Sequence, residues 1–267
     1  MIDYRIIQKA SAEQKIPPEV IEKDYLIELI LYHIAQDKSL QSILVFRGGT
    51  ALRKAYFPDF RYSEDLDFIT KPQKGFSFIS AHLEAMVKNI ADCYPIDLSL
   101  TTSFPQKGHL QIFLNYDIVP EVRAVKQLKL DIVEDTIILS WHVKKLLFAF
   151  PDLKTISTAL QIYDLESIAA EKIGRILDVV DEPRDLWDLL YLLKSNKTKS
   201  SRIQSEFISK YGYKIPLPNL LKSIKKPVYE KQWMIRLQNQ IPGLMPYHET
   251  IKNLGTMIKA KITASKE

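Results

Sequence analysis

The sequence predicts an α+β protein in which a domain built on a mixed or antiparallel sheet precedes a C-terminal helical bundle. The chain has 267 residues, of which 46% are hydrophobic, so it can bury one large core or two ordinary ones. Segments that alternate polar and apolar residues lie early in the chain, whereas the periodicity from residue 164 onward is helical. We therefore predict two domains, residues 1–163 and 164–267.

Proline, glycine and periodicity predict the first elements. Pro17 and Pro18 indicate the start of a helix that extends to about Gln36, because apolar residues then recur at helical spacing. The apolar run 42–46 predicts a buried strand, and a helix is expected at 51–57 after a turn. Alternation at 65–69 predicts a half-buried strand, followed by a helix at about 76–93.

The later elements separate into strands and then helices. Residues 96–100, 110–116 and 128–132 each alternate and predict further strands of the sheet. Helices are expected at 164–180 and 183–194, with shorter helices to the end. Residues 194–202 (KSNKTKSSR) predict a basic, solvated and mobile connector.

Composition excludes several classes of protein. The single cysteine, Cys93, excludes an internal disulfide and indicates a reducing, cytoplasmic location; its place at the end of an apolar-periodic helix predicts a buried thiol. No apolar run reaches membrane-spanning length, and residues 1–18 lack a signal pattern, so neither membrane insertion nor secretion is expected. The five histidines show no ligand spacing, and no Walker motif occurs, so a zinc site and a P-loop ATPase are not expected.

Charge is divided unevenly along the chain. The total is only +5, but residues 189–267 hold 15 Lys and Arg against four acids, which leaves −6 for residues 1–188. Such asymmetry within one chain predicts a polyanionic partner for the basic part.

A glycine turn follows the strand predicted at 42–46. Gly48 and Gly49 allow the backbone to approach a ligand closely, and the helix that begins near Thr50 offers unpaired N–H groups and a positive dipole end. One interpretation is that the triphosphate of a nucleotide binds at this turn. A tight strand-to-helix turn without a ligand is the alternative.

Three aspartates are candidate metal ligands. Asp65 and Asp67 point to the same face of their strand, and two carboxylates this close repel each other unless a cation such as Mg²⁺ lies between them. Asp131 lies on the polar face of a later strand, where it is a candidate ligand for a second ion. The alternative for all three is a solvent-facing strand surface.

These features occur together in a pattern that resembles a known family. Residues 47–70 (RGGTALRKAYFPDFRYSEDLDFIT) are very similar to the signature of the AbiEii/AbiGii-toxin nucleotidyltransferases, a branch of the DNA polymerase β-like superfamily. Further motifs match in order at 21–31 (IEKDYLIELIL), 128–135 (LKLDIVED) and 170–193 (AEKIGRILDVVDEPRDLWDLLYLL). The resemblance implies a polymerase β-like nucleotidyltransferase domain followed by a helical bundle. One departure is Gly-Gly-Thr where the superfamily usually has Gly-Ser.

The resemblance also implies roles for individual residues. Asp65 and Asp67 would bind metal with Asp131 as the third acid. Lys172 would reach the triphosphate, and Asp185 would support either nucleotide binding or Lys172. Gly48, Gly49 and Thr50 would cradle the nucleotide phosphates. Lys54, which flanks the motif with Arg53 and Arg61, is a candidate to neutralise phosphate, and Ser63 is a candidate nucleotide contact or a cap of the strand entry.

The implied reaction moves a nucleoside monophosphate from an NTP to an acceptor hydroxyl, with two Mg²⁺ ions and release of pyrophosphate. The family implies a toxin with a cognate antitoxin, and a tRNA 3′ end is the expected acceptor. Six basic residues are the candidate nucleic-acid contacts: Lys197, Lys199, Arg202, Lys222, Lys225 and Lys226. Four aromatic residues among them would stack on bases or form the helical core: Tyr211, Tyr213, Tyr229 and Trp233.

Three other functions remain open at this point. The chain could be a catalytically silent nucleic-acid-binding protein, or it could nucleotidylate a protein or a small molecule. A nuclease that uses Asp131 and Glu134 is the third, although no correctly spaced lysine supports it.

Overall fold

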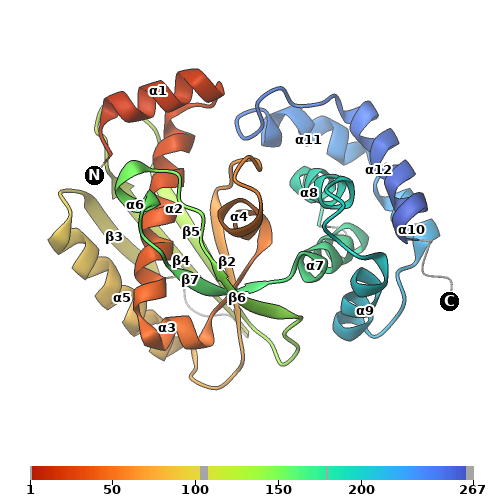
Figure 1. Ribbon diagram of the computed structural model, residues 1–267, viewed down its shortest axis with the longest axis horizontal. Coiled ribbons are helices and arrows are strands. Elements are labelled where there is room, and N and C mark those ends of the chain that lie inside the picture. The colour runs from red at the N-terminus through yellow and green to blue at the C-terminus, as the bar shows by residue number, and fades with distance from the viewer. Residues whose placement is uncertain (1, 103–107, 179, 263–267) are drawn as a thin grey trace. The chain divides into compact units, whose positions relative to one another are not determined.

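The computed structural model describes residues 2–102, 108–178 and 180–262 (Figure 1). The chain forms two compact units. The first comprises Met1–Ile138 with His142–Ile162, and the second comprises Leu139–Trp141 with Tyr163–Glu267. The predicted α+β class is confirmed, since a mixed sheet lies in the early part of the chain and helices alone follow it.

The sheet has seven strands in the order β3-β4-β5-β2-β1-β7-β6. The strands β2 and β5 pair in parallel, as do β1 and β7, whereas β1 pairs with β2, β3 with β4 and β4 with β5 in antiparallel fashion. The bounds are β1 Val45–Arg47, β2 Asp65–Thr70, β3 Asp97–Thr102, β4 His109–Asp117, β5 Gln127–Glu134, β6 Trp141–Lys145 and β7 Ala159–Tyr163.

Alternation separates the two faces of the central strands. Leu66, Phe68, Leu130 and Ile132 are fully buried on one face, and Phe46 of β1 packs beside Phe68 with a ring-centroid distance of 5.2 Å. The opposite face carries half-buried polar residues of β2 and β5. Burial of the apolar face therefore fixes the orientation of the polar one.

The helices of the first unit are α1 Tyr4–Gln14, α2 Pro18–Gln36, α3 Lys38–Ile43, α4 Gly48–Ala51, α5 Phe76–Cys93 and α6 Pro151–Lys154, with a π-helical turn η1 at Leu52–Tyr56. Helix α2 begins and ends where predicted, and it is buried along most of its length. It carries three buried acids as well as apolar residues, namely Glu22, Asp24 and Glu28.

The second unit is a bundle of helices: α7 Leu165–Leu177, α8 Pro183–Lys194, α9 Ser200–Tyr211, α10 Leu217–Ser223, α11 Pro227–Leu237 and α12 Tyr247–Ile262. Its core includes Leu189, Phe207, Tyr229 and Trp233. The Trp233 Nε1–H donates to the Met245 carbonyl at 2.9 Å, so the one polar atom of this buried ring is satisfied.

Some sequence predictions are corrected. The helix expected at 51–57 already begins at Gly48, and the connector expected at 194–202 ends when α9 begins at Ser200. Cys93 is exposed rather than buried, because it is the last residue of α5 and the buried stripe ends at Ile90. None of the helices in the described part of the chain is long and apolar enough to cross a membrane.

Candidate active site

The three candidate aspartates lie on neighbouring strands and on one face of the sheet. In the parallel pairing of β2 with β5, Asp67 is the register partner of Asp131, and Asp65 is the partner of Lys129. Residues in register point to the same side. The sheet therefore brings together carboxylates that are more than 60 residues apart in the sequence.

Two basic side chains hold the third aspartate. The Lys129 Nζ lies 2.5 Å from Asp131 Oδ2, and the His109 Nε2 lies 3.1 Å from Asp131 Oδ1. Partial burial opposes protonation of Lys129, but the hydrogen bond to Asp131 and the charges of Asp65, Asp131 and Asp67 raise its pKa above the ordinary value. Lys129 is thus an internal counter-ion of the face that carries Asp65, Asp67 and Asp131, which we call the acidic face.

Sequence reasoning missed both of these residues. Lys129 lies two positions before Asp131 on the same strand, so its shared face was a usable signal. His109 carried no such signal, because its contact depends on the register of β4 against β5.

The glycine turn packs directly against the acids. Gly48 has φ +78°, and a Cβ atom at this position would collide with Asp67 Oδ2 and come within 3.2 Å of Asp67 Cβ and Cγ. The Thr50 hydroxyl donates to the Asp65 carbonyl at 2.5 Å and is buried. The hydroxyl that was expected to contact phosphate thus ties the first turn of α4 to the start of β2.

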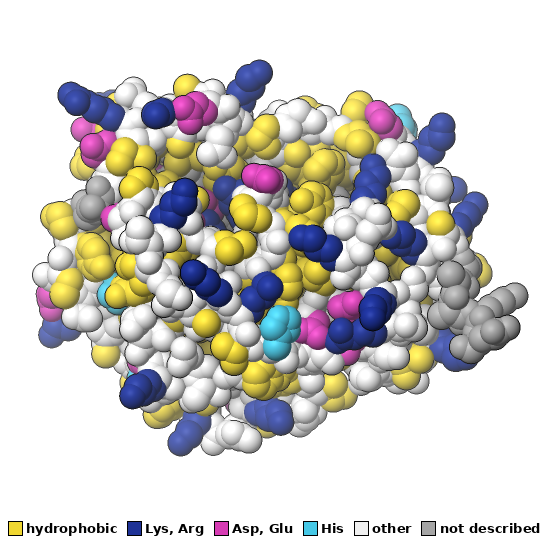
Figure 2. Space-filling model, viewed as in Figure 1, with side chains coloured by type: hydrophobic (Ala, Val, Ile, Leu, Met, Phe, Trp, Pro, Cys, Tyr) yellow, Lys and Arg dark blue, Asp and Glu magenta, His cyan; other side chains and the backbone are white. Residues whose placement is uncertain are grey.

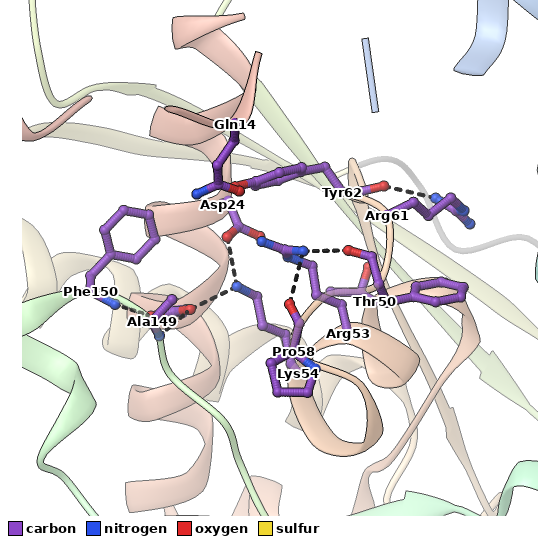
Figure 3. Close-up of polar contacts among 12 residues, drawn as sticks. Gln14, Asp24, Thr50, Arg53, Lys54, Pro58, Arg61, Tyr62, Ala149 and Phe150 are labelled. Carbon is purple, nitrogen blue, oxygen red and sulfur yellow. Dashed lines mark hydrogen bonds and ion pairs between the residues drawn. The ribbon is translucent and has the colours of Figure 1, made fainter. Parts of the chain in front are cut away.

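Lys54 lies in an internal ion-pair network behind this turn (Figure 3). Its Nζ is 2.8 Å from Asp24 Oδ2 and 2.7 Å from Glu28 Oε1, and the residue is only 1% exposed. The expected phosphate contact by Lys54 is therefore corrected, since its charge is compensated inside the protein. Ser63 is also buried, two residues before β2.

Neighbouring groups complete the network. The Arg53 guanidinium lies 3.8 Å from the Tyr62 ring centre, and its Nε is 3.5 Å from Asp24 Oδ1. The Ala149 N–H donates to Glu28 Oε1 at 2.9 Å. Burial raises the pKa of Glu28, and the charge of Lys54 opposes the rise. The network joins η1 to α2, and because η1 directly follows α4, it anchors the segment that carries the glycine turn.

A second cluster lies in the helical unit. The Lys172 Nζ is 2.6 Å from Asp185 Oδ1 and 2.8 Å from Asp188 Oδ2, and the Arg175 Nε is 2.7 Å from Asp185 Oδ2. Asp185 and Asp188 are fully buried, so α8 presents two carboxylates to the cations of α7. Of the two roles expected for Asp185, this contact concerns the one toward Lys172, and the phosphate role of Lys172 stays a prediction.

The candidate nucleic-acid contacts differ in their surroundings. Lys197, Lys199, Lys222 and Lys225 are exposed. Arg202 instead lies 2.6 Å from Asp164 Oδ2, and this pairing raises its pKa. Figure 2 shows several Lys and Arg side chains over the part of the view that α10, α11 and α12 occupy in Figure 1.

The four aromatic residues also differ. Tyr229 and Trp233 belong to the core, with exposed fractions of 0% and 2%. Tyr211 packs against Phe207 within the bundle, whereas Tyr213 is 46% exposed.

The donor set on the acidic face fits a hard cation in chemistry. Asp65 and Asp67 supply carboxylate oxygens, the ligands that Mg²⁺ prefers, while Asp131 is held by Lys129 and His109. Within residues 2–102, 108–178 and 180–262, no group of three or more His, Cys, Asp or Glu side chains is placed to hold a metal ion. Because Lys129 and His109 pair with Asp131, the chemistry of the Asp65–Asp67 pair fits a cation better than that of the complete triad.

Comparison with known proteins identifies the class. The family model described as the nucleotidyl transferase AbiEii toxin of type IV toxin–antitoxin systems matches residues 29–258. The chain belongs to this family and is a nucleotidyltransferase of the toxin class.

One solved structure shares this fold, and a second shows a weaker likeness. The nucleotidyltransferase toxin MenT4 from Mycobacterium tuberculosis H37Rv is similar over 97% of this chain and 89% of its own, with 16% identity and a TM-score of 0.64. The antibiotic-resistance factor ANT(2'')-Ia covers 71% of this chain and 93% of its own, with 12% identity and a TM-score of 0.45. No curated protein matches the chain.

Proposed function

We propose that this protein transfers a nucleoside monophosphate from an NTP to a hydroxyl of an RNA acceptor, with the three aspartates of β2 and β5 at the reacting centre. The observation that carries the proposal is the register of Asp67 with Asp131, together with the contact of Gly48 against Asp67. A phosphate chain bound at the backbone N–H groups of this turn would lie next to the carboxylates.

The chemistry is an in-line displacement. The acceptor oxygen attacks the α-phosphorus, a new P–O bond forms, and the bond to the bridging oxygen of the β-phosphate breaks to release pyrophosphate. Asp131 is the proposed acceptor of the hydroxyl proton, a role supported by its register with Asp67, and its pairs with Lys129 and His109 would have to loosen for it. Lys172 is the proposed cation for the leaving pyrophosphate, a role that rests on the family motif and requires Lys172 to give up its ion pairs with Asp185 and Asp188.

A divalent cation, with Mg²⁺ as the proposed ion, would be held by Asp65 and Asp67. When bound, it would neutralise charge on the phosphate oxygens and so favour nucleophilic attack. Two ions are the expected number in the superfamily. Here a second ion on Asp131 would require displacement of Lys129 from its 2.5 Å ion pair.

A tRNA 3′ end is the proposed acceptor. The basic composition of residues 189–267 supports a polyanionic partner, because Lys and Arg contacts to phosphate provide most non-specific affinity for nucleic acid. Membership of a type IV toxin–antitoxin family implies a cognate antitoxin that counteracts the reaction.

The test is incubation with labelled NTPs and total RNA over a range of Mg²⁺ concentrations. Wild type should label RNA, and an Asp65→Ala/Asp67→Ala variant should not. Asp97→Asn is the control, because Asp97 is an exposed aspartate of β3 and should keep full activity. Equal labelling by wild type and the double variant, or none by either, would exclude the proposal.

The same assay separates the other functions. A labelled product that forms without RNA would indicate nucleotidylation of a protein or small molecule. RNA binding without labelling would indicate a catalytically silent binding protein, and shortened RNA without NTP would indicate a nuclease.

A further inference from the structure

A groove of about 590 Å³ opens in the helical unit, between the end of α7 and the segment that leads from α9 through α10 to α11. This volume is within the range that small-molecule sites occupy. Six polar or aromatic residues define the groove: Asp178, Tyr213, Asn219, Lys222, Ser223 and Lys226. None of them belongs to the acidic face or to the Lys172 cluster.

Tyr213 provides a fixed aromatic surface in this groove. Phe207 supports its ring edge-on at a centroid distance of 5.3 Å, and Tyr211 lies at 6.4 Å, yet 46% of the residue is exposed. An exposed ring that is held by its neighbours is what a nucleobase needs for stacking, because no ordering of the ring is required on binding.

Lys226 provides a charge with unused hydrogen-bonding capacity. Its Nζ is buried and has no hydrogen-bond partner among the described residues, and the Asp181 carboxylate lies 3.5 Å away. A phosphate oxygen would supply the missing acceptor once the partly exposed Lys226 side chain turns its Nζ from Asp181 into the groove. Lys222 is exposed four residues earlier in the same groove and adds a second positive charge.

Asn219 and Asp178 complete the chemistry. The amide of Asn219 can both donate to and accept from the polar edge of a base. Asp178 disfavours phosphate near its own position, but it can accept from a ribose hydroxyl or a base amino group. Stacking surface, cations and edge-reading groups therefore occur together within one groove.

We propose that this groove binds one unpaired nucleotide of a single-stranded RNA segment, with the base on Tyr213 and its phosphate at Lys222 and Lys226. The inference deepens the proposed function and rests on it in taking the acceptor to be RNA. An acidic peptide would satisfy the two lysines but would leave the aromatic face and the amide without a matching group.

The test is fluorescence anisotropy of full-length protein with 5′-labelled decauridylate, which is unpaired, and with a ten-base-pair RNA duplex. Tyr213→Ala should weaken decauridylate binding about 5- to 150-fold, since this is the effect of losing one stacked base. Tyr213→Phe should bind like wild type, and duplex binding should not change.

The contribution of Lys222 and Lys226 is measured separately, through the salt dependence of binding. Lys222→Gln/Lys226→Gln should reduce the slope of log Kd against log salt by about 1.4, because each single-strand phosphate contact contributes about 0.7. Lys231→Gln/Lys252→Gln removes two exposed lysines of α11 and α12 and should leave the slope unchanged. Circular dichroism and thermal melting check that each variant is folded.

Either of two results would refute the proposal that this groove binds a nucleotide. One is wild-type decauridylate affinity in folded Tyr213→Ala. The other is decaglutamate binding that matches decauridylate binding and is weakened equally by Tyr213→Ala, since this would identify a peptide site. Nucleotidyl transfer is measured in parallel. Groove-dependent binding without transfer supports the groove and refutes only the proposed function, whereas transfer with unaffected Tyr213→Ala binding refutes only the groove.

Discussion

Replacement of Gly48 by alanine tests whether the glycine turn positions the acidic face. Gly48 has φ +78°, a backbone conformation that costs an L-residue about 1–2 kcal/mol. The lower entropy of the unfolded alanine chain offsets about 0.4–1 kcal/mol of this cost. Backbone strain alone therefore lowers the free energy of unfolding by about 1 kcal/mol.

The added methyl group has a second effect at this position. It would overlap with Asp67 Oδ2, so the turn or the carboxylate must move, and overpacking of this kind costs about 1–3 kcal/mol more. A displacement of the order of 1 Å at a reacting centre typically reduces the rate about 100-fold. We predict a folded protein whose nucleotidyl transfer is reduced at least about 100-fold.

Gly243→Ala is the matched control, because Gly243 has φ +64° with no atom within 4 Å of the added Cβ. It should lose about 1 kcal/mol of stability and keep its activity. Urea unfolding and the labelled-NTP assay measure the two quantities. Full activity in Gly48→Ala, or an equal loss of activity in both variants, would refute the positioning role.

Three further predictions concern stability. Lys54→Met removes the closest cation from the buried carboxylates of Glu28 and Asp24, of which Asp24 keeps the more distant Arg53, and should lower the free energy of unfolding by about 3 kcal/mol in urea titrations. Asp37→Ala removes the N-cap of α3 and should cost about 1 kcal/mol at pH 7. Burial of Asp37 tends to raise its pKa, but hydrogen bonds from His82 and the backbone outweigh this effect, so the pKa is lowered. The stabilisation by Asp37 is therefore present above about pH 4 and is lost as the pH falls through the lowered pKa. Gly174→Ala would overlap with the Tyr211 ring and lower the melting temperature, whereas Gly255→Ala on α12, with its nearest atom at 3.9 Å, should raise it.

For each of these stability predictions, one outcome would contradict it. Wild-type urea stability of Lys54→Met would mean that the network does not hold η1. A difference between wild type and Asp37→Ala that grows on acidification would reverse the sign of the linkage. Similar melting shifts in the two glycine variants would show that the contact between α7 and α9 tolerates a methyl group.

Local patterns predicted the elements that have strong local causes. Helix α8 was predicted at 183–194 and α5 at 76–93, because proline and a regular apolar stripe mark them. Strand β6 was missed, since its residues are largely exposed and do not alternate. Helix α1 was missed as well, because it is polar overall and buries only Ile7.

The candidate site could be predicted only in part. The shared face of Asp65 and Asp67 follows from the strand period, but the position of Asp131 beside Asp67 depends on the order of strands, which no local pattern contains. Lys54 was misassigned because its proximity to the glycine turn in sequence suggested phosphate. Its partners on α2 come from about 30 residues earlier, and buried acids within an apolar helix were the available signal.

The most direct test of the central claim compares two positions of the radioactive label. Wild-type protein is incubated with RNA and an NTP labelled at either the α- or the γ-phosphorus, and Asp65→Asn is run beside it. We predict that the α-label enters RNA while an equal amount of pyrophosphate is released, that the γ-label does not enter RNA, and that Asp65→Asn transfers neither label. Incorporation of γ-label, or undiminished transfer of α-label by Asp65→Asn, would contradict this prediction.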